Sequence, residues 1–136
     1  MSKTPQLQLT PKDFKVNQAW LAYKANRKPL PTDKGDVDVF ILQDAGSLFI
    51  FGNAFTPVGA ESPNPRDAAV LLQEAWSRKQ EWPSELLLPG AQSEDNGFAR
   101  AASWNGISVR FLPAECLSYF IEDVQSSYEE FLNRGD

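Results

Sequence analysis

Apolar and β-branched residues alternate between two faces in residues 37–42, and a second apolar run occupies residues 48–51. The intervening residues 44–47, Asp-Ala-Gly-Ser, have the composition of a short turn. Two such runs joined by a short glycine-containing segment predict an antiparallel β-hairpin.

Apolar residues then recur at helical spacing in three segments. The first begins at Asn64, a favourable N-cap followed by proline, the second at Ser93, and the third at Pro113. Asn105-Gly106 is typical of the end of the second helix, because glycine accepts the left-handed backbone that closes many helices. The apolar stripes extend over residues 68–76, 98–102 and 117–131.

Two short strands are predicted between these helices. Residues 85–88 form a continuous apolar run typical of a buried strand, and residues 107–111 alternate apolar and polar. Residues 17–26 allow two interpretations. Asn17 as a cap, three alanines and Pro29 as a stop favour a helix, whereas the apolar alternation that leads to Ala22 favours a strand buried on both faces. We favour the strand because it completes a known order of elements.

The remaining segments are predicted from proline and glycine content. Residues 28–35 are expected to form a loop, and residues 1–13, with two prolines, a flexible lead-in. Residues 14–136 contain no repeat and no low-complexity segment, so we expect one domain.

With residues 18–25 as a strand, the element order is β-β-β-α-β-α-β-α. This order resembles the ribonuclease-H-like fold and a group of small uncharacterised bacterial domains that share it, over roughly residues 16–132. The resemblance implies an α/β (mixed α+β) class, with a five-stranded mixed sheet covered by helices on both faces. The three consecutive strands would form a meander, and the later strands would lie parallel to the first.

The resemblance does not extend to the chemistry of ribonuclease-H-like nucleases, which hold two Mg²⁺ ions between clustered carboxylates. The family places one acid in the middle of the first strand and one near the end of the fourth. Here residues 20–23 and 87–90 contain none. Glu74 and Glu115 match only the outlying helical acids, so we expect no enzymatic activity. A degenerate metal-dependent nuclease that uses a metal site formed by Asp36, Asp38 and Glu74 is retained as an alternative function.

Composition excludes further classes of chemistry. The absence of histidine removes Ser-His-Asp and Cys-His catalysis and histidine-ligated zinc. No glycine motif suits a nucleotide, so no cofactor is expected. The single cysteine, Cys116, and the lack of a secretory signal or membrane-length apolar run indicate a cytoplasmic protein.

Charge is uneven along the chain, whose net charge is −5. Residues 1–34 carry seven basic and two acidic side chains, and the other 102 residues carry six basic and sixteen acidic ones. Because net acidity opposes binding to phosphate backbones, we do not expect nucleic acid as a partner.

These exclusions favour a non-catalytic protein-interaction domain that also self-associates, forming a homodimer through an exposed sheet edge at residues 48–51 or through the last helix. Trp82 and Trp104 lie off the helical stripes, and exposed tryptophans often anchor interfaces. The candidate interface or pocket residues are therefore Trp82, Trp104, Phe49, Phe51 and Phe55. The same aromatic residues could instead line a small-molecule pocket, which is the alternative function.

Overall fold

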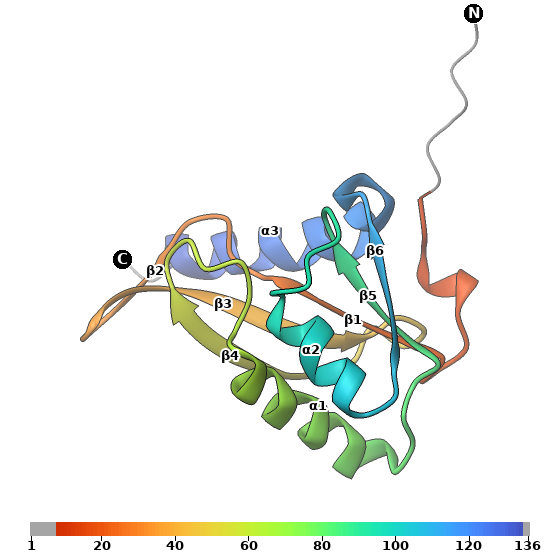
Figure 1. The fold of residues 1–136 in the computed structure, drawn as a ribbon. Helices are drawn as coiled ribbons and strands as arrows, with labels where there is room; N and C mark the ends of the chain where they lie inside the picture. The colour runs from red at the N-terminus through yellow and green to blue at the C-terminus, as the bar shows by residue number, and fades with distance from the viewer. Residues whose placement is uncertain (1–7, 135–136) are drawn as a thin grey trace, which may run out of the picture.

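Strand β1 (Ala19–Lys24) lies at the centre of one mixed β-sheet in the computed structural model, which describes residues 8–134 (Figure 1). It pairs antiparallel with β3 (Gly35–Asp44) and parallel with β5 (Glu85–Pro89). All its residues except Lys24 are buried. A strand with neighbours on both edges and helices on both faces must be apolar on both sides. The strand interpretation of residues 17–26 is therefore confirmed.

The sheet continues outward from this centre in both directions. Strand β4 (Ile50–Pro57) pairs antiparallel with the other side of β3, which confirms the hairpin. The expected bounds of its second strand, residues 48–51, were wrong: Leu48 belongs to the turn, with a φ of 68°, and the strand continues to Pro57. Strand β6 (Ser108–Leu112) pairs parallel with β5. The order across the sheet is thus β4-β3-β1-β5-β6, with β4 and β6 at the edges. The class is confirmed as mixed α/β.

A sixth strand was not expected. Residues 28–35 were predicted as a loop, but Leu30–Thr32 forms β2 and pairs with the first residues of β3. Pro31 is tolerated because β2 is short and lies at the end of the sheet, where a missing N–H need not be paired. The expected five-stranded sheet therefore has six strands.

Helices cover the two faces of the sheet unequally (Figure 1). Helices α1 (Pro65–Lys79) and α2 (Gly97–Trp104) lie on one face, over a core that includes Trp20, Leu86 and Phe98. Helix α3 (Ser118–Arg134) lies alone on the other face, over Leu21 and Ile41. No helix in residues 8–134 is long and apolar enough to cross a membrane.

Two predicted helix boundaries were also wrong. Helix α2 is capped by Asn96 rather than Ser93, because the Asn96 side chain accepts hydrogen bonds from the N–H groups of Phe98 and Ala99. Pro113 begins not α3 itself but a short 3-10 turn, η2 (Ala114–Leu117), which leads into α3.

The described part of the expected lead-in is structured. Leu9 is buried, and its N–H donates to the Cys116 carbonyl at 2.9 Å. Residues Pro11–Asp13 form a 3-10 turn, η1, closed by a hydrogen bond from the Thr10 N–H to the Asp13 carboxylate. The first seven residues of the predicted lead-in lie outside the described residues.

Candidate functional site

Exposed apolar side chains gather on β4 and the segments that flank it. Among residues 8–134, ten large apolar side chains are exposed, and five of them lie between residues 48 and 58. Residues 45–60 contain no charged side chain. We call this group the β4 patch; its members are Leu48, Phe49, Ile50, Phe55 and Val58. It is an uncharged apolar surface on an edge strand.

Part of the β4 patch faces α3. Because α3 covers β1 and β3 but not β4, Leu48 and Ile50 line an open hollow of about 430 Å³ beside Tyr119 and Tyr128. Burial raises the pKa of the Tyr128 hydroxyl, so this hydroxyl carries no charge on its side of the hollow. Asp123 supplies one carboxylate to its rim.

Trp104 forms a second exposed site, at the end of α2. Its side chain is 61% exposed and lines two neighbouring hollows. One hollow, of about 880 Å³, lies between α2, β6 and the loop that follows β5. Arg100 and Phe111 are among the residues that line it. The other, of about 610 Å³, lies on α1 against Val70. The expectation that Trp104 lies off the core stripe agrees with this exposure.

Trp82 and Phe51, in contrast, are packing residues. The Trp82 ring lies 6.0 Å from that of Trp20 and 6.1 Å from that of Trp76. Phe51 is buried, with its ring 5.0 Å from Trp20. Phe49 continues this row of aromatic rings to the surface, where Arg78 lies over its exposed face. Of the five candidate residues, Trp104, Phe49 and Phe55 are exposed and Trp82 and Phe51 are not.

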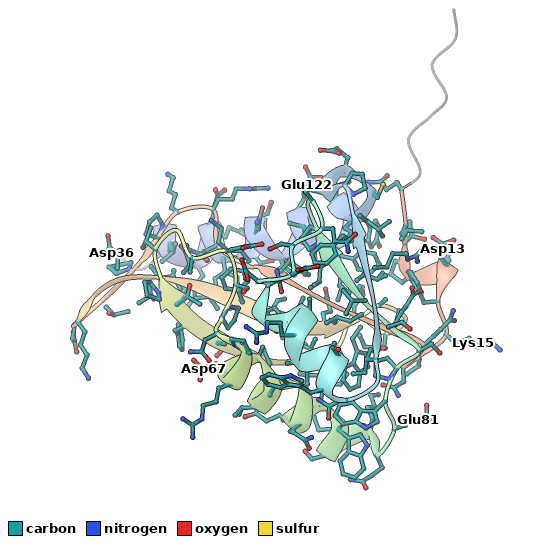
Figure 2. All side chains as sticks on the ribbon, viewed as in Figure 1. Asp13, Lys15, Asp36, Asp67, Glu81 and Glu122 are labelled. Carbon is teal, nitrogen blue, oxygen red and sulfur yellow. The ribbon has the colours of Figure 1, made fainter. Side chains whose placement is uncertain are left out.

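The carboxylates of the alternative metal site do not come together. Asp36 points outward at the end of the sheet where β2 turns into β3 (Figure 2). Glu74 lies against Gly52 of β4, and Gly52 pairs with Leu42 of β3. Leu42 is four residues along β3 from Asp38, so Glu74 lies far from the Asp38 carboxylate. Four strand residues span about 13 Å. Residues 8–134 contain no group of three carboxylate, cysteine or histidine side chains placed to hold a metal ion.

Asp38 instead joins two loops. Its carboxylate accepts hydrogen bonds from Asn26 Nδ2 and the Gly59 N–H, both at 3.0 Å, and lies 3.9 Å from Lys24 Nζ. Burial alone would raise the pKa of Asp38, but these two hydrogen bonds and the Lys24 charge together hold it below its ordinary value. Asp38 is therefore ionised and fully engaged within the fold.

A small hollow of about 230 Å³ lies at the carboxyl ends of β1 and β5. Open α/β sheets commonly bind ligands at such a point. Lys24 and Glu61 are the charged side chains of its lining, and Ala22 and Leu88 occupy the strand positions. One ammonium and one carboxylate do not form the clustered carboxylates that a two-metal site needs.

Sequence reasoning missed a buried polar cluster around Asp44. One carboxylate oxygen accepts from the Asn17 N–H, and the other from the N–H and hydroxyl of Ser47. Asn17 Oδ1 accepts from the indole N–H of Trp20 at 2.7 Å. Cys116 is also buried. These groups hold the fold together and expose no reactive atom.

Comparison with known proteins supports the fold alone. No family model and no curated protein match the sequence. Among 47 matching chains of solved structures is one from the cryoEM structure of the simian T-cell lymphotropic virus intasome in complex with PP2A regulatory subunit B56 gamma. The TM-score is 0.61 at 13% sequence identity, over 95% of this chain and 42% of that chain. This chain therefore spans less than half the length of that one, and the two share a mixed α/β arrangement.

Proposed function

We propose that this protein is a non-catalytic protein-interaction domain with a ribonuclease-H-like arrangement, which binds a protein partner and itself. The sheet order β4-β3-β1-β5-β6, with a meander followed by two parallel strands, supports the arrangement. The scattered carboxylates support a function without catalysis, and the proposed function needs no cofactor.

The exposure of Trp104 is the observation that carries the proposal. A tryptophan side chain contributes roughly 150–250 Å² of surface when it is buried. With 61% of it exposed, burial by a partner would contribute about 2–4 kcal/mol at roughly 25 cal/mol per Å². Arg100, one helical turn before Trp104, is exposed beside it, and arginine and tryptophan are both enriched among residues that dominate binding energy.

The test is affinity capture of the tagged protein from a lysate of its source cells, with and without nuclease, followed by mass spectrometry. We expect a stoichiometric protein that survives nuclease and is lost with Trp104→Ala. Phe131→Ala is the matched control, because Phe131 is exposed on α3, on the other face. Capture that is equal for Trp104→Ala and the wild type would contradict the Trp104 site, and recovery of nucleic acid alone would contradict the protein-binding proposal.

A small-molecule-binding module is the second candidate function. The hollow beside α2 has a volume of about 880 Å³, within the usual range for ligand sites, and Trp104 and Phe111 give it aromatic walls. A ligand there would shift the tryptophan emission of the wild type but not that of Trp104→Phe. A metabolite panel without any such shift would count against this candidate.

The compartment is part of the same proposal. Cys116 is the only cysteine in the chain, so no disulfide can form within it. Proteins without disulfides suit a reducing environment, which supports the cytoplasm.

A further inference from the structure

The outer edge of β4 presents free backbone groups. In β3, the Val39 N–H donates to the Asn26 side chain and its carbonyl accepts from the Ala25 N–H, both at 2.8 Å, so both groups point away from β4. Val39 pairs with Phe55, and this pair is therefore the non-hydrogen-bonded type. In such a pair the backbone groups of both residues point outward. The N–H and carbonyl of Phe55 thus face the free edge of the sheet.

The same geometry applies two residues away. Asn53 pairs with Ile41, and hydrogen-bonded and non-hydrogen-bonded pairs alternate along an antiparallel ladder. The N–H and carbonyl of Asn53 therefore also face the free edge. No strand in residues 8–134 pairs with this edge of β4.

The absence of charged side chains along β4 favours a second copy of this chain as the occupant of the edge. Edge strands are normally protected against pairing by charged side chains. The protein has a net charge of −5, yet residues 45–60 have no charge at all. Two copies can therefore approach along β4 without like charges meeting in that segment. A two-fold interface also requires a surface that complements itself, and an antiparallel pair of identical strands meets that requirement.

Extending the proposed function, we propose that two copies of this protein pair through antiparallel β4 strands, with the two-fold axis beside Ala54. The N–H of Asn53 donates to the carbonyl of the partner's Phe55, and the N–H of the partner's Phe55 donates to the carbonyl of Asn53. Symmetry repeats this exchange, giving four hydrogen bonds that use all the outward-facing groups of Asn53 and Phe55. The two sheets become one.

The sequence of β4 selects this register. If the axis passed beside Phe55, Asn53 would face the partner's Pro57, which has no N–H to donate. On the other side, an irregularity opposite Leu42 and Gln43 interrupts the regular pairing of β4. With the axis beside Ala54, the two Ala54 residues face each other on the α1 side. On the α3 side, the two Phe55 rings are diagonal neighbours, within reach of each other.

Sedimentation measurements over a range of concentrations test the pairing. We expect the wild type to form a dimer and Asn53→Pro to weaken dimerisation by about 30-fold or more, because two symmetry-related donors are lost. Asn53→Pro leaves the β3 ladder intact, since the lost N–H points outward. Asn53→Thr keeps that N–H and is the matched control, expected to dimerise as the wild type does. Circular dichroism of both variants checks that they fold.

Cysteine cross-linking tests the register. Facing residues of a non-hydrogen-bonded pair have Cα atoms about 4.5 Å apart, which a disulfide can span. We expect Ala54→Cys to form a disulfide-linked dimer under mild oxidation much faster than Phe55→Cys. The wild type, in which Cys116 is buried, gives the background rate of cross-linking.

A wild type that stays monomeric at high concentration, or an Asn53→Pro variant that dimerises normally, would overturn the proposed pairing. Faster cross-linking by Phe55→Cys would overturn the register. A monomeric wild type would remove self-association from the proposed function, but none of these results would change capture of a partner through Trp104. Failure of the β4 pairing is therefore distinguishable from failure of the Trp104 site.

Discussion

At the scale of single residues, Asn17 connects three parts of the fold. It has a positive φ of 65°, a conformation that asparagine tolerates better than most residues. Its N–H donates to Asp44, its side-chain oxygen accepts from Trp20, and its side-chain amide donates to the Glu81 carbonyl. One residue thus joins the loop before β1 to the end of β3 and to the segment after α1.

Asn17→Ala should therefore lower the free energy of unfolding by about 2–4 kcal/mol, because the buried Trp20 N–H loses its acceptor and alanine is strained at positive φ. Asn17→Gly should lower the free energy of unfolding by a smaller amount, because glycine adopts a positive φ without strain. Urea unfolding measures both, with Gln73→Ala as the exposed control. Equal stabilities for Asn17→Ala and the control would contradict this role.

Protonation of Asp38 should make the free energy of unfolding depend on pH in the acid range. Its pKa is lowered in the folded state from the ordinary value of 3.8. A depressed pKa contributes stability that is fully present above 3.8 and is lost as pH falls through the folded value. The wild type should consequently lose more stability than Asp38→Asn as pH falls below 3.8. Thermal unfolding from pH 6 to pH 2 measures the difference, and parallel curves would contradict it.

The sequence predicted some site residues and misplaced others for a physical reason. Trp104 falls off the apolar periodicity, and it is exposed. Trp82 also falls outside a stripe, but it packs between Trp20 and Trp76, two residues far from each other in sequence. Local periodicity carries no information about such a contact. Phe51 was grouped with Phe49 because both belong to one run. Strand β4 begins only at Ile50, so Phe49 precedes the strand and is exposed, whereas Phe51 packs against Trp20.

At the scale of elements, segments with a clear local pattern were predicted well, whereas strand β2, the bounds of β4 and the start of α2 were not. Strand β3, helix α1 and strand β5 follow from local pattern alone, as does the existence of the β3–β4 hairpin. Strand β2 has only three residues and contains Pro31, so its pairing depends on β3 rather than on its own sequence. The start of α2 depends on a contact with a distant loop, where the Gly97 N–H donates to Ser62 Oγ at 2.8 Å.

This contact makes Gly97 sensitive to substitution. A Cβ atom at this position would lie 2.0 Å from the carbonyl oxygen of Pro63, so α2 would have to move away from the start of α1. We expect Gly97→Ala to lower the free energy of unfolding by about 1–3 kcal/mol, the usual cost of overpacking. Arg100→Ala, at an exposed position of the same helix, is the control. Chemical denaturation measures both, and a stabilised Gly97→Ala would contradict the close approach.

At the scale of the whole molecule, the two edges of the sheet differ in character. The β4 edge is uncharged and bears the β4 patch, whereas β6 carries Arg110, paired with Glu85 at 3.1 Å. This difference supports the β4 edge as the binding surface for a second copy. The Trp104 site lies elsewhere and stays available for another partner.

Dimerisation should also appear in thermal stability. A complex formed only by folded chains raises the melting temperature as concentration rises. For two chains of this size we expect the melting temperature to increase by about 2–3 °C for each tenfold increase in concentration above the dissociation constant. Asn53→Pro should show this increase only at concentrations about 30-fold higher or more. Scanning calorimetry at several concentrations measures the slope, and a flat wild-type curve would contradict dimerisation.

The position of β1 at the centre of the sheet also determines when the chain can fold during its synthesis. β1 leaves the ribosome well before its parallel neighbour β5, which begins only at Glu85, and the Leu9 N–H gains its partner only after Cys116 has been synthesised. Such distant pairings place folding on the slower side for domains of this size. Until β5 emerges, the nascent chain exposes one edge of β1 together with the uncharged edge of β4. The stretch of synthesis before residue 85 is therefore when this chain most needs protection by a chaperone.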